Sequence, residues 1–178
     1  MSDPDRVMLD IETLGLDPGA TIVAIGAVRF DADGLGAVFQ QSISLTSCQR
    51  AGLTIDAETL DWWLAQDDLA KEQLNGGGRL KDVLEDFAEW YGDADEIWAN
   101  SPSFDCDILS AAYDAVGLDE PWEFYDERDF RTLKSFEAAP QPEQAGVEHD
   151  ALDDARHQAE IAAETLRRLE PTEVDADV

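Results

Sequence analysis

The alternation of apolar and polar residues along the chain predicts three strands at its start. The segments RVMLDIE and GATIVAIGAVRFD are short apolar runs bounded by turn residues, and DADG leads into a third run, GAVFQQSISL. Consecutive strands with such short connections are typical of an antiparallel meander. The first strands of a sheet are therefore expected here.

After this meander the pattern changes to helical spacing. DAETLDWWLAQDDLAKEQL, with Asp56 as its expected N-cap, and RLKDVLEDFAEWYG are predicted helices on either side of an NGGG break. EIWAN is expected to be a short strand, SFDCDILSAAYDAVG a helix ended by Gly117, and WEFYDERDFRTL a strand running into a turn. The last predicted helix is HDALDDARHQAEIAAETLRRLE, with Asp150 as N-cap and Asp153 in capping-box position. This order predicts an α/β fold with a mixed sheet.

The length of 178 residues suits one domain, which we expect over residues 1–170, with a frayed acidic tail over 171–178. No apolar stretch is long enough for a membrane span, and no membrane partner is expected. Cys48 and Cys106 are isolated, which suits a reducing cytoplasm and gives no zinc motif.

The charge balance is extreme, with 41 acidic against 12 basic residues and a net charge of -29. Such a charge argues against polyanionic partners in dilute salt, because nucleic-acid binding normally needs a basic patch. In about 1 M salt the Debye length falls to about 3 Å and this repulsion nearly vanishes. The acid-rich, lysine-poor composition therefore predicts a halophilic, salt-filled cytoplasm, cellular or viral in origin; an unusually acidic ordinary cytosolic protein is the alternative.

Asp10 and Glu12 lie one residue apart at the end of the first predicted strand. Their side chains share one side of that strand, because strand side chains alternate with period two. Two carboxylates on a half-buried face repel each other and are costly to desolvate, so a cation is expected between them. Because 41 of 178 residues are acidic, such a pair also arises by chance, and a solvated strand end is the alternative.

Two further acids occupy positions that can meet this pair. Asp105 follows the strand EIWAN where a helix begins, and Asp154 lies in the first turn of the last helix. Ligand sites of open sheets gather beyond the carboxyl ends of strands, where all four carboxylates can converge.

The segments LDIETLG, NSPSFD and HDALDD, in this order, resemble the three motifs of the DEDD 3′–5′ exonucleases, and the His places the resemblance in the DEDDh branch. The sequence from Val7 to Ala163 as a whole is similar to the small phage-type and mycobacterial-type exonucleases of this branch. The resemblance implies an RNase H-like five-stranded mixed sheet, three antiparallel strands then parallel ones, with helices on both faces. It also implies two divalent cations, Mg²⁺ or Mn²⁺, which prefer oxygen ligands.

On this resemblance Asp10 bridges the two cations, Glu12 and Asp154 complete the shell of the first, and Asp105 supports the site through water. His149 would be the general base, since an imidazole titrates near neutrality; a surface histidine is the alternative. If the register of the motifs were shifted, Asp107 and Asp153 would be the substitutes. His157, inside the last helix, is expected at the surface.

Substrate contacts are expected from two groups of residues. Thr13 and Leu14 would offer backbone N–H groups and an apolar wedge to the terminal nucleotide, and Phe104 and Trp63 would stack on bases, although Trp63 suits the core equally well. Asn100 would lie near the second cation or simply end its strand. Arg131 and Arg128 would contact phosphate or form internal salt bridges.

The sequence therefore predicts a 3′–5′ exonuclease that converts single-stranded DNA or RNA 3′ ends to 5′-mononucleotides, with DNA slightly favoured. An exoribonuclease or oligoribonuclease-like phosphodiesterase is the alternative within enzymes. A catalytically silent nucleic-acid-binding domain on the same fold is the alternative outside them. A monomer and a homodimer both remain open.

Overall fold

The computed structural model describes residues 4–66, 71–140, 142 and 150–169. Its centre is one five-stranded sheet with strand order β3-β2-β1-β4-β5. The strands are β1 (Arg6–Thr13), β2 (Ile22–Asp31), β3 (Gly34–Ser42), β4 (Glu96–Ala99) and β5 (Glu127–Asp129). β1, β2 and β3 pair antiparallel, whereas β4 and β5 run parallel to β1. The predicted mixed sheet is confirmed, with β1 as its central strand.

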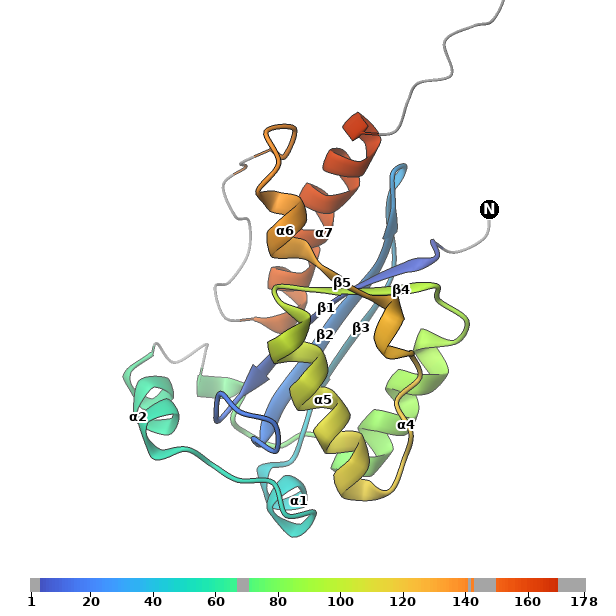
Figure 1. Ribbon diagram of the computed structural model, residues 1–178. Helices are drawn as coiled ribbons and strands as arrows, with labels where there is room; N and C mark the ends of the chain where they lie inside the picture. Colours follow the sequence, from blue (N-terminus) through green and yellow to red (C-terminus); the bar gives the residue numbers. More distant parts are fainter. Residues whose placement is uncertain (1–3, 67–70, 141, 143–149, 170–178) are drawn as a thin grey trace, which may run out of the picture.

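Helices cover both faces of this sheet, as Figure 1 shows. On one face lie α4 (Leu80–Tyr91) and α5 (Pro102–Val116), and on the other lie α6 (Phe130–Lys134) and α7 (Ala151–Leu169). Two shorter helices, α1 (Leu45–Arg50) and α2 (Ala57–Ala65), lie beyond one end of the sheet. A 3₁₀ turn at Phe124–Asp126 precedes β5.

The side chains of β1 divide between two apolar layers. Val7, Leu9 and Ile11 are buried in the layer beneath α4 and α5. Met8 is buried in the layer beneath α6 and α7. Because side chains alternate along a strand, Asp10 and Glu12 face the same side as Met8, toward α7.

Gly26 allows α7 to begin directly on the sheet. It pairs with Asp10 in the antiparallel register of β1 and β2. A Cβ at this glycine would lie 2.2 Å from the carbonyl carbon of Ala151 and 2.3 Å from the amide nitrogen of Leu152. The backbone of the first turn of α7 thus packs onto the strand beside Asp10, at a distance that only glycine permits.

Several of the scarce cations have structural roles. The Arg29 guanidinium is buried and donates to the carbonyl oxygens of Tyr91 at 2.6 Å and Pro4 at 2.9 Å, linking β2 to the end of α4. Glu96 pairs with Arg6 at 3.0 Å and with Arg128 at 3.1 Å. Of the two uses expected for Arg128, the structure therefore contains the salt bridge.

The structure refines several predicted elements. Asp56 caps α2 as predicted, accepting a hydrogen bond from the Thr59 amide at 2.8 Å, and Asp150 accepts from the Asp153 amide at 3.1 Å at the start of α7. The short helix α1 was not predicted, and WEFYDERDFRTL contains a 3₁₀ turn, a three-residue strand and most of α6. Cys48 and Cys106 are buried free thiols.

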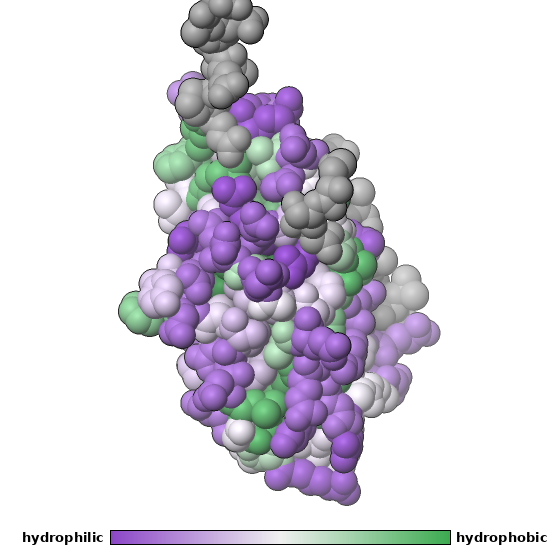
Figure 2. Space-filling model, turned by 90° about the vertical axis from the view of Figure 1, so that its right-hand side faces the viewer, coloured by the Kyte–Doolittle hydropathy of each residue, from purple (hydrophilic) through white to green (hydrophobic). Residues whose placement is uncertain are grey.

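The surface view in Figure 2 is mostly hydrophilic, with small separated hydrophobic areas. Among the helices of the described residues, none combines the length and the apolar character needed to cross a membrane.

Candidate active site

Three carboxylates from two elements converge at the end of the central strand. Asp10 and Glu12 come from β1 and Asp154 from the first turn of α7, and one oxygen of each lies within 4.8 Å of the others. Asp154 reaches this position because α7 begins on Gly26, opposite Asp10. Around one Mg²⁺, adjacent ligand oxygens are about 3 Å apart and opposite ones about 4.2 Å, at a metal–oxygen distance of about 2.1 Å. Three carboxylate oxygens this close together therefore suit a hard divalent cation.

Asp105 approaches the same place from the other face of the sheet. It lies in the first turn of α5 and is buried, with 3% of its surface exposed. Its Oδ1 accepts a hydrogen bond at 3.2 Å from the amide of Ile11, the residue between Asp10 and Glu12. The negative charge of Asp105 raises the pKa of Asp10 and of Glu12. The fourth acid is thus fixed at the strand end beside the other three.

Burial and mutual repulsion favour the protonated forms of these acids. The pKa of Glu12 rises from 4.5 to about 8, chiefly through desolvation and then through the charges of Asp154 and Asp105. The pKa of Asp10 is raised for the same reasons. Desolvation raises the pKa of Asp105 to about 7, against the opposing effects of the Ile11 amide and the positive charge of Arg131. Without a cation, the site holds protons at neutral pH.

This proton uptake predicts how the stability of the metal-free protein depends on pH. Between pH 4.5 and 8 folded Glu12 keeps a proton that the unfolded chain has released, so the free energy of unfolding falls as pH rises. In EDTA we expect it to be lower at pH 8 than at pH 6 by at least about 1 kcal/mol, measured by urea denaturation. Saturating Mg²⁺ should remove this slope, and a Glu12→Gln variant should reduce it. An equal slope in wild type with and without Mg²⁺ would contradict the electrostatics described here.

Gln158 is a site residue that the sequence analysis missed. Its Nε2 donates a hydrogen bond at 2.8 Å to Asp10 Oδ1, and the residue is buried in α7 with 8% exposure. Its Oε1 is buried and has no hydrogen-bond partner among the described residues. The available signal was spacing, since Gln158 lies four residues after Asp154 and so on the same helix face. This amide fixes the orientation of the Asp10 carboxylate.

A largely apolar pocket of about 440 Å³ adjoins Glu12. Its aromatic walls are Trp62, Trp63 and Phe104. Trp63 belongs to the core as well, with 1% exposure and an indole N–H that donates to the Thr13 carbonyl oxygen at 2.9 Å. The pocket has the size and lining of a small-ligand site, such as one for a nucleobase.

Leu16, and not Leu14, presents an exposed aliphatic side chain at this pocket. Leu14 is fully buried in a cluster with Val23 and Trp63, whereas Leu16 is 73% exposed and lines the pocket. The predicted apolar contact through the side chain of Leu14 does not fit this burial, whereas the side chain of Leu16 is accessible at the pocket. Thr13 lines the pocket, and its hydroxyl donates to the Gly15 carbonyl oxygen at 2.7 Å.

The remaining predicted residues have different outcomes. Asn100 is exposed directly after β4. Arg131 is exposed on α6, and its positive charge acts to lower the pKa of Asp105. His149 lies outside the described residues. Of the substitutes considered for a shifted register, Asp107 is exposed on α5, and Asp153 pairs with Arg156 at 3.9 Å.

Known structures and sequences provide independent comparisons. A structural match to the nuclease domain of 3′hExo, a DEDDh family member bound to rAMP, has a TM-score of 0.65 and 14% identity, covering 94% of this chain and 95% of that one. It shows the DEDDh RNase H-like fold. PolC-type DNA polymerase III of Listeria innocua and of Listeria monocytogenes are each 29% identical over 121 residues. That match spans 67% of this chain but 8% of those polymerases.

The family comparison covers nearly the whole fold. The model of the Rv2179c-like family, described as a 3′–5′ exoribonuclease domain, matches residues 5–166, a range that includes every strand and all four acids of the site. The chain therefore belongs to the Rv2179c-like 3′–5′ exoribonuclease domain family.

Proposed function

We propose that this exonuclease removes 5′-mononucleotides from single-stranded 3′ ends with the help of two divalent cations, Mg²⁺ or Mn²⁺. The observation that carries the proposal is the convergence of Asp10, Glu12 and Asp154 oxygens within 4.8 Å, next to an aromatic pocket. Four anions gathered in a half-buried place are stable together only when protons or cations neutralise them.

Each acid has a distinct role in the proposal. Asp10, Glu12 and Asp154 would hold the cations, with Asp10 as the ligand that both would share. Asp105 supports the strand end through the Ile11 amide, and Gln158 orients Asp10. When bound, two cations supply the Lewis acidity that activates water and stabilises the leaving oxygen. His149 accepts the proton from the attacking water, as the HDALDD motif implies.

We propose RNA 3′ ends as the preferred substrate, whereas the sequence alone slightly favoured DNA. The support is the exoribonuclease description of the family that the chain belongs to. The terminal base would enter the pocket formed by Trp62, Trp63 and Phe104, where aromatic faces bind bases without sequence preference. The net charge of -29 supports a salt-rich working environment, in which screening weakens repulsion from the substrate.

One assay tests activity, polarity, sugar and salt together. Matched single-stranded RNA and DNA oligonucleotides, labelled at either end, are incubated with Mn²⁺, Ca²⁺ or EDTA at about 0.1 M and 2 M KCl. We expect mononucleotide release from the 3′ end with Mn²⁺, faster for RNA and retained in 2 M KCl, and none with Ca²⁺ or EDTA. Release from the 5′ end, or hydrolysis in EDTA, would refute the proposal. Binding without cleavage in Mn²⁺ would favour the silent binding domain.

A further inference from the structure

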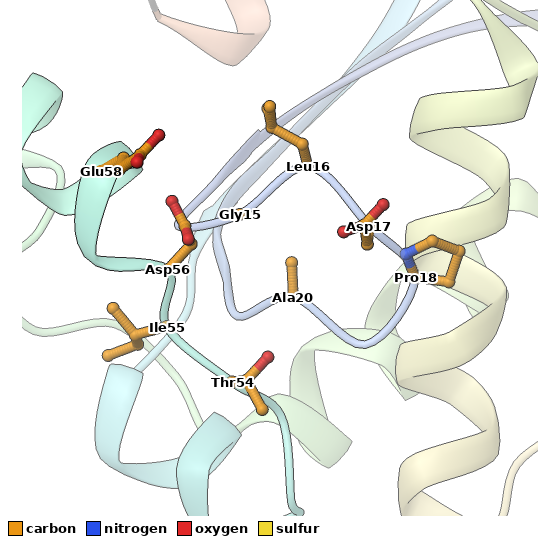
Figure 3. A pocket seen from close by; sticks show the side chains of 9 residues that line it. All are labelled: Gly15, Leu16, Asp17, Pro18, Ala20, Thr54, Ile55, Asp56 and Glu58. Atoms are coloured by element: carbon orange, nitrogen blue, oxygen red, sulfur yellow. The ribbon is translucent and has the colours of Figure 1, made fainter.

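The two sides of the acid cluster differ in charge. On the side of α2, a second pocket of about 350 Å³ is lined by Asp17, Asp56 and Glu58, shown with Leu16 in Figure 3. This pocket shares Leu16, Asp56 and Glu58 with the aromatic pocket beside Glu12. Carboxylates lining a cavity repel phosphate groups. A polyanionic strand is therefore disfavoured along this side.

On the other side, α6 presents cations that are available to a ligand. Most arginines and lysines of the described residues are in ion pairs or bind carbonyl groups. Arg131 and Lys134 are exposed, and neither has an ion pair within the described part of the chain. They lie three residues apart on α6 and therefore on one helix face. Arg131 is close enough to the site for its charge to lower the pKa of Asp105.

An exposed aromatic ring follows these cations. Phe136 lies two residues beyond Lys134 and is 48% exposed. It lines a cavity of about 290 Å³ at the edge of the sheet, together with Trp98 and Leu133. Two acids also line this cavity, namely Glu127, which accepts from the Trp122 indole, and Asp129, which caps α6, and the cation Arg128 lies beside them. Cations followed by an exposed ring are the combination that binds single strands without sequence preference.

We propose that the α6 track, defined as Arg131, Lys134 and Phe136, holds the 5′ side of the substrate strand. The proposal rests on the function proposed above, because a 3′ end in the aromatic pocket leaves the rest of the strand to depart from the acid cluster. Phosphates upstream of the reacting one lie along Arg131 and Lys134, and an upstream base stacks on Phe136. Acidic lining on the α2 side and unpaired cations on the α6 side together set this direction.

Substrate length tests the track separately from the chemistry. A dinucleotide without a 5′ phosphate has one phosphate, held at the acid cluster, so none is left for Lys134. Its single upstream base lies next to that phosphate and not beyond Lys134, where Phe136 follows. We compare wild type with the Lys134→Gln/Phe136→Ala variant on a dinucleotide and on a 12-mer in Mn²⁺. The matched control is Arg50→Gln/Phe124→Ala, which removes an exposed arginine at the end of α1 and an exposed ring before β5.

We expect kcat/KM of the α6 variant to fall about tenfold on the 12-mer, mainly through KM, and to stay within twofold on the dinucleotide. The slope of log(kcat/KM) against log[KCl] for the 12-mer should become shallower by about 0.7, the contribution of one lost phosphate contact. The control should match wild type on both substrates. An equal loss on both substrates, an unchanged 12-mer rate, or an equal loss in the control would overturn the track. A wild type inactive on both would instead refute the proposed function, and the track with it.

Discussion

Replacing Asp10 with asparagine should reduce hydrolysis of a 3′-labelled oligonucleotide by at least about 10³-fold while the protein remains folded. Asp10 is the carboxylate expected to lie between both cations, and an amide there offers one neutral oxygen in place of two that share a negative charge. The change is nearly isosteric, and the amide oxygen of asparagine can still accept the hydrogen bond from Gln158. The rate is measured in saturating Mn²⁺ under single-turnover conditions.

The same variant has an opposite effect on the stability of the metal-free protein. Asp10 is a buried acid whose pKa is raised by desolvation and by three neighbouring carboxylates. Its neutral replacement should leave the Tm in EDTA at or above that of wild type, and should abolish the rise in Tm that Mn²⁺ produces. Asp107→Asn, an exposed acid on α5, is the matched control and should behave as wild type. Activity of the Asp10 variant within tenfold of wild type would rule out the assigned bridging role.

Replacing His149 with alanine should lower kcat by roughly 10²- to 10⁴-fold, the range for loss of a general acid or base. The reason is chemical, since the variant keeps all four carboxylates and lacks only the imidazole that accepts the proton from water. Binding of Mn²⁺, followed by the rise in Tm on titration, should therefore be preserved.

His157→Ala is the control for this second variant, because His157 lies in α7 outside the HDALDD motif. It should retain the wild-type rate. An unchanged rate for His149→Ala would show that His149 is not the general base. Loss of Mn²⁺ binding together with activity would assign His149 to the metal shell instead of to proton transfer.

The positions of the four acids were predictable from local rules together with the motif resemblance, which selects Asp105 and Asp154 over Asp107 and Asp153. Period-two alternation puts Asp10 and Glu12 on one side of β1, and helix starts fix Asp105 and Asp154. That Asp154 meets Asp10 also depends on Gly26, whose lack of a side chain lets α7 begin on the sheet. A single sequence shows that glycine but not the helix packed against it.

Other features depend on contacts that the local pattern does not contain. The register of β1 and β2 shifts between Glu12 and Thr13, so simple alternation does not continue to Leu14, which turns into the core and leaves Leu16 at the pocket. Gln158 meets Asp10 across 148 positions of sequence. The five residues of α6 are too few for a helical period to be visible. Arg128 forms a salt bridge with Glu96 and Arg131 does not, a difference that only the tertiary structure shows.

Crystals of the protein grown with Mn²⁺ and a 5′-mononucleotide test the central claim most directly, through the anomalous scattering of manganese. We expect two peaks about 3.5–4 Å apart, with Asp10 between them and with Glu12 and Asp154 within coordinating distance of one. Manganese bound elsewhere, with no peak in reach of these three carboxylates, would contradict this claim.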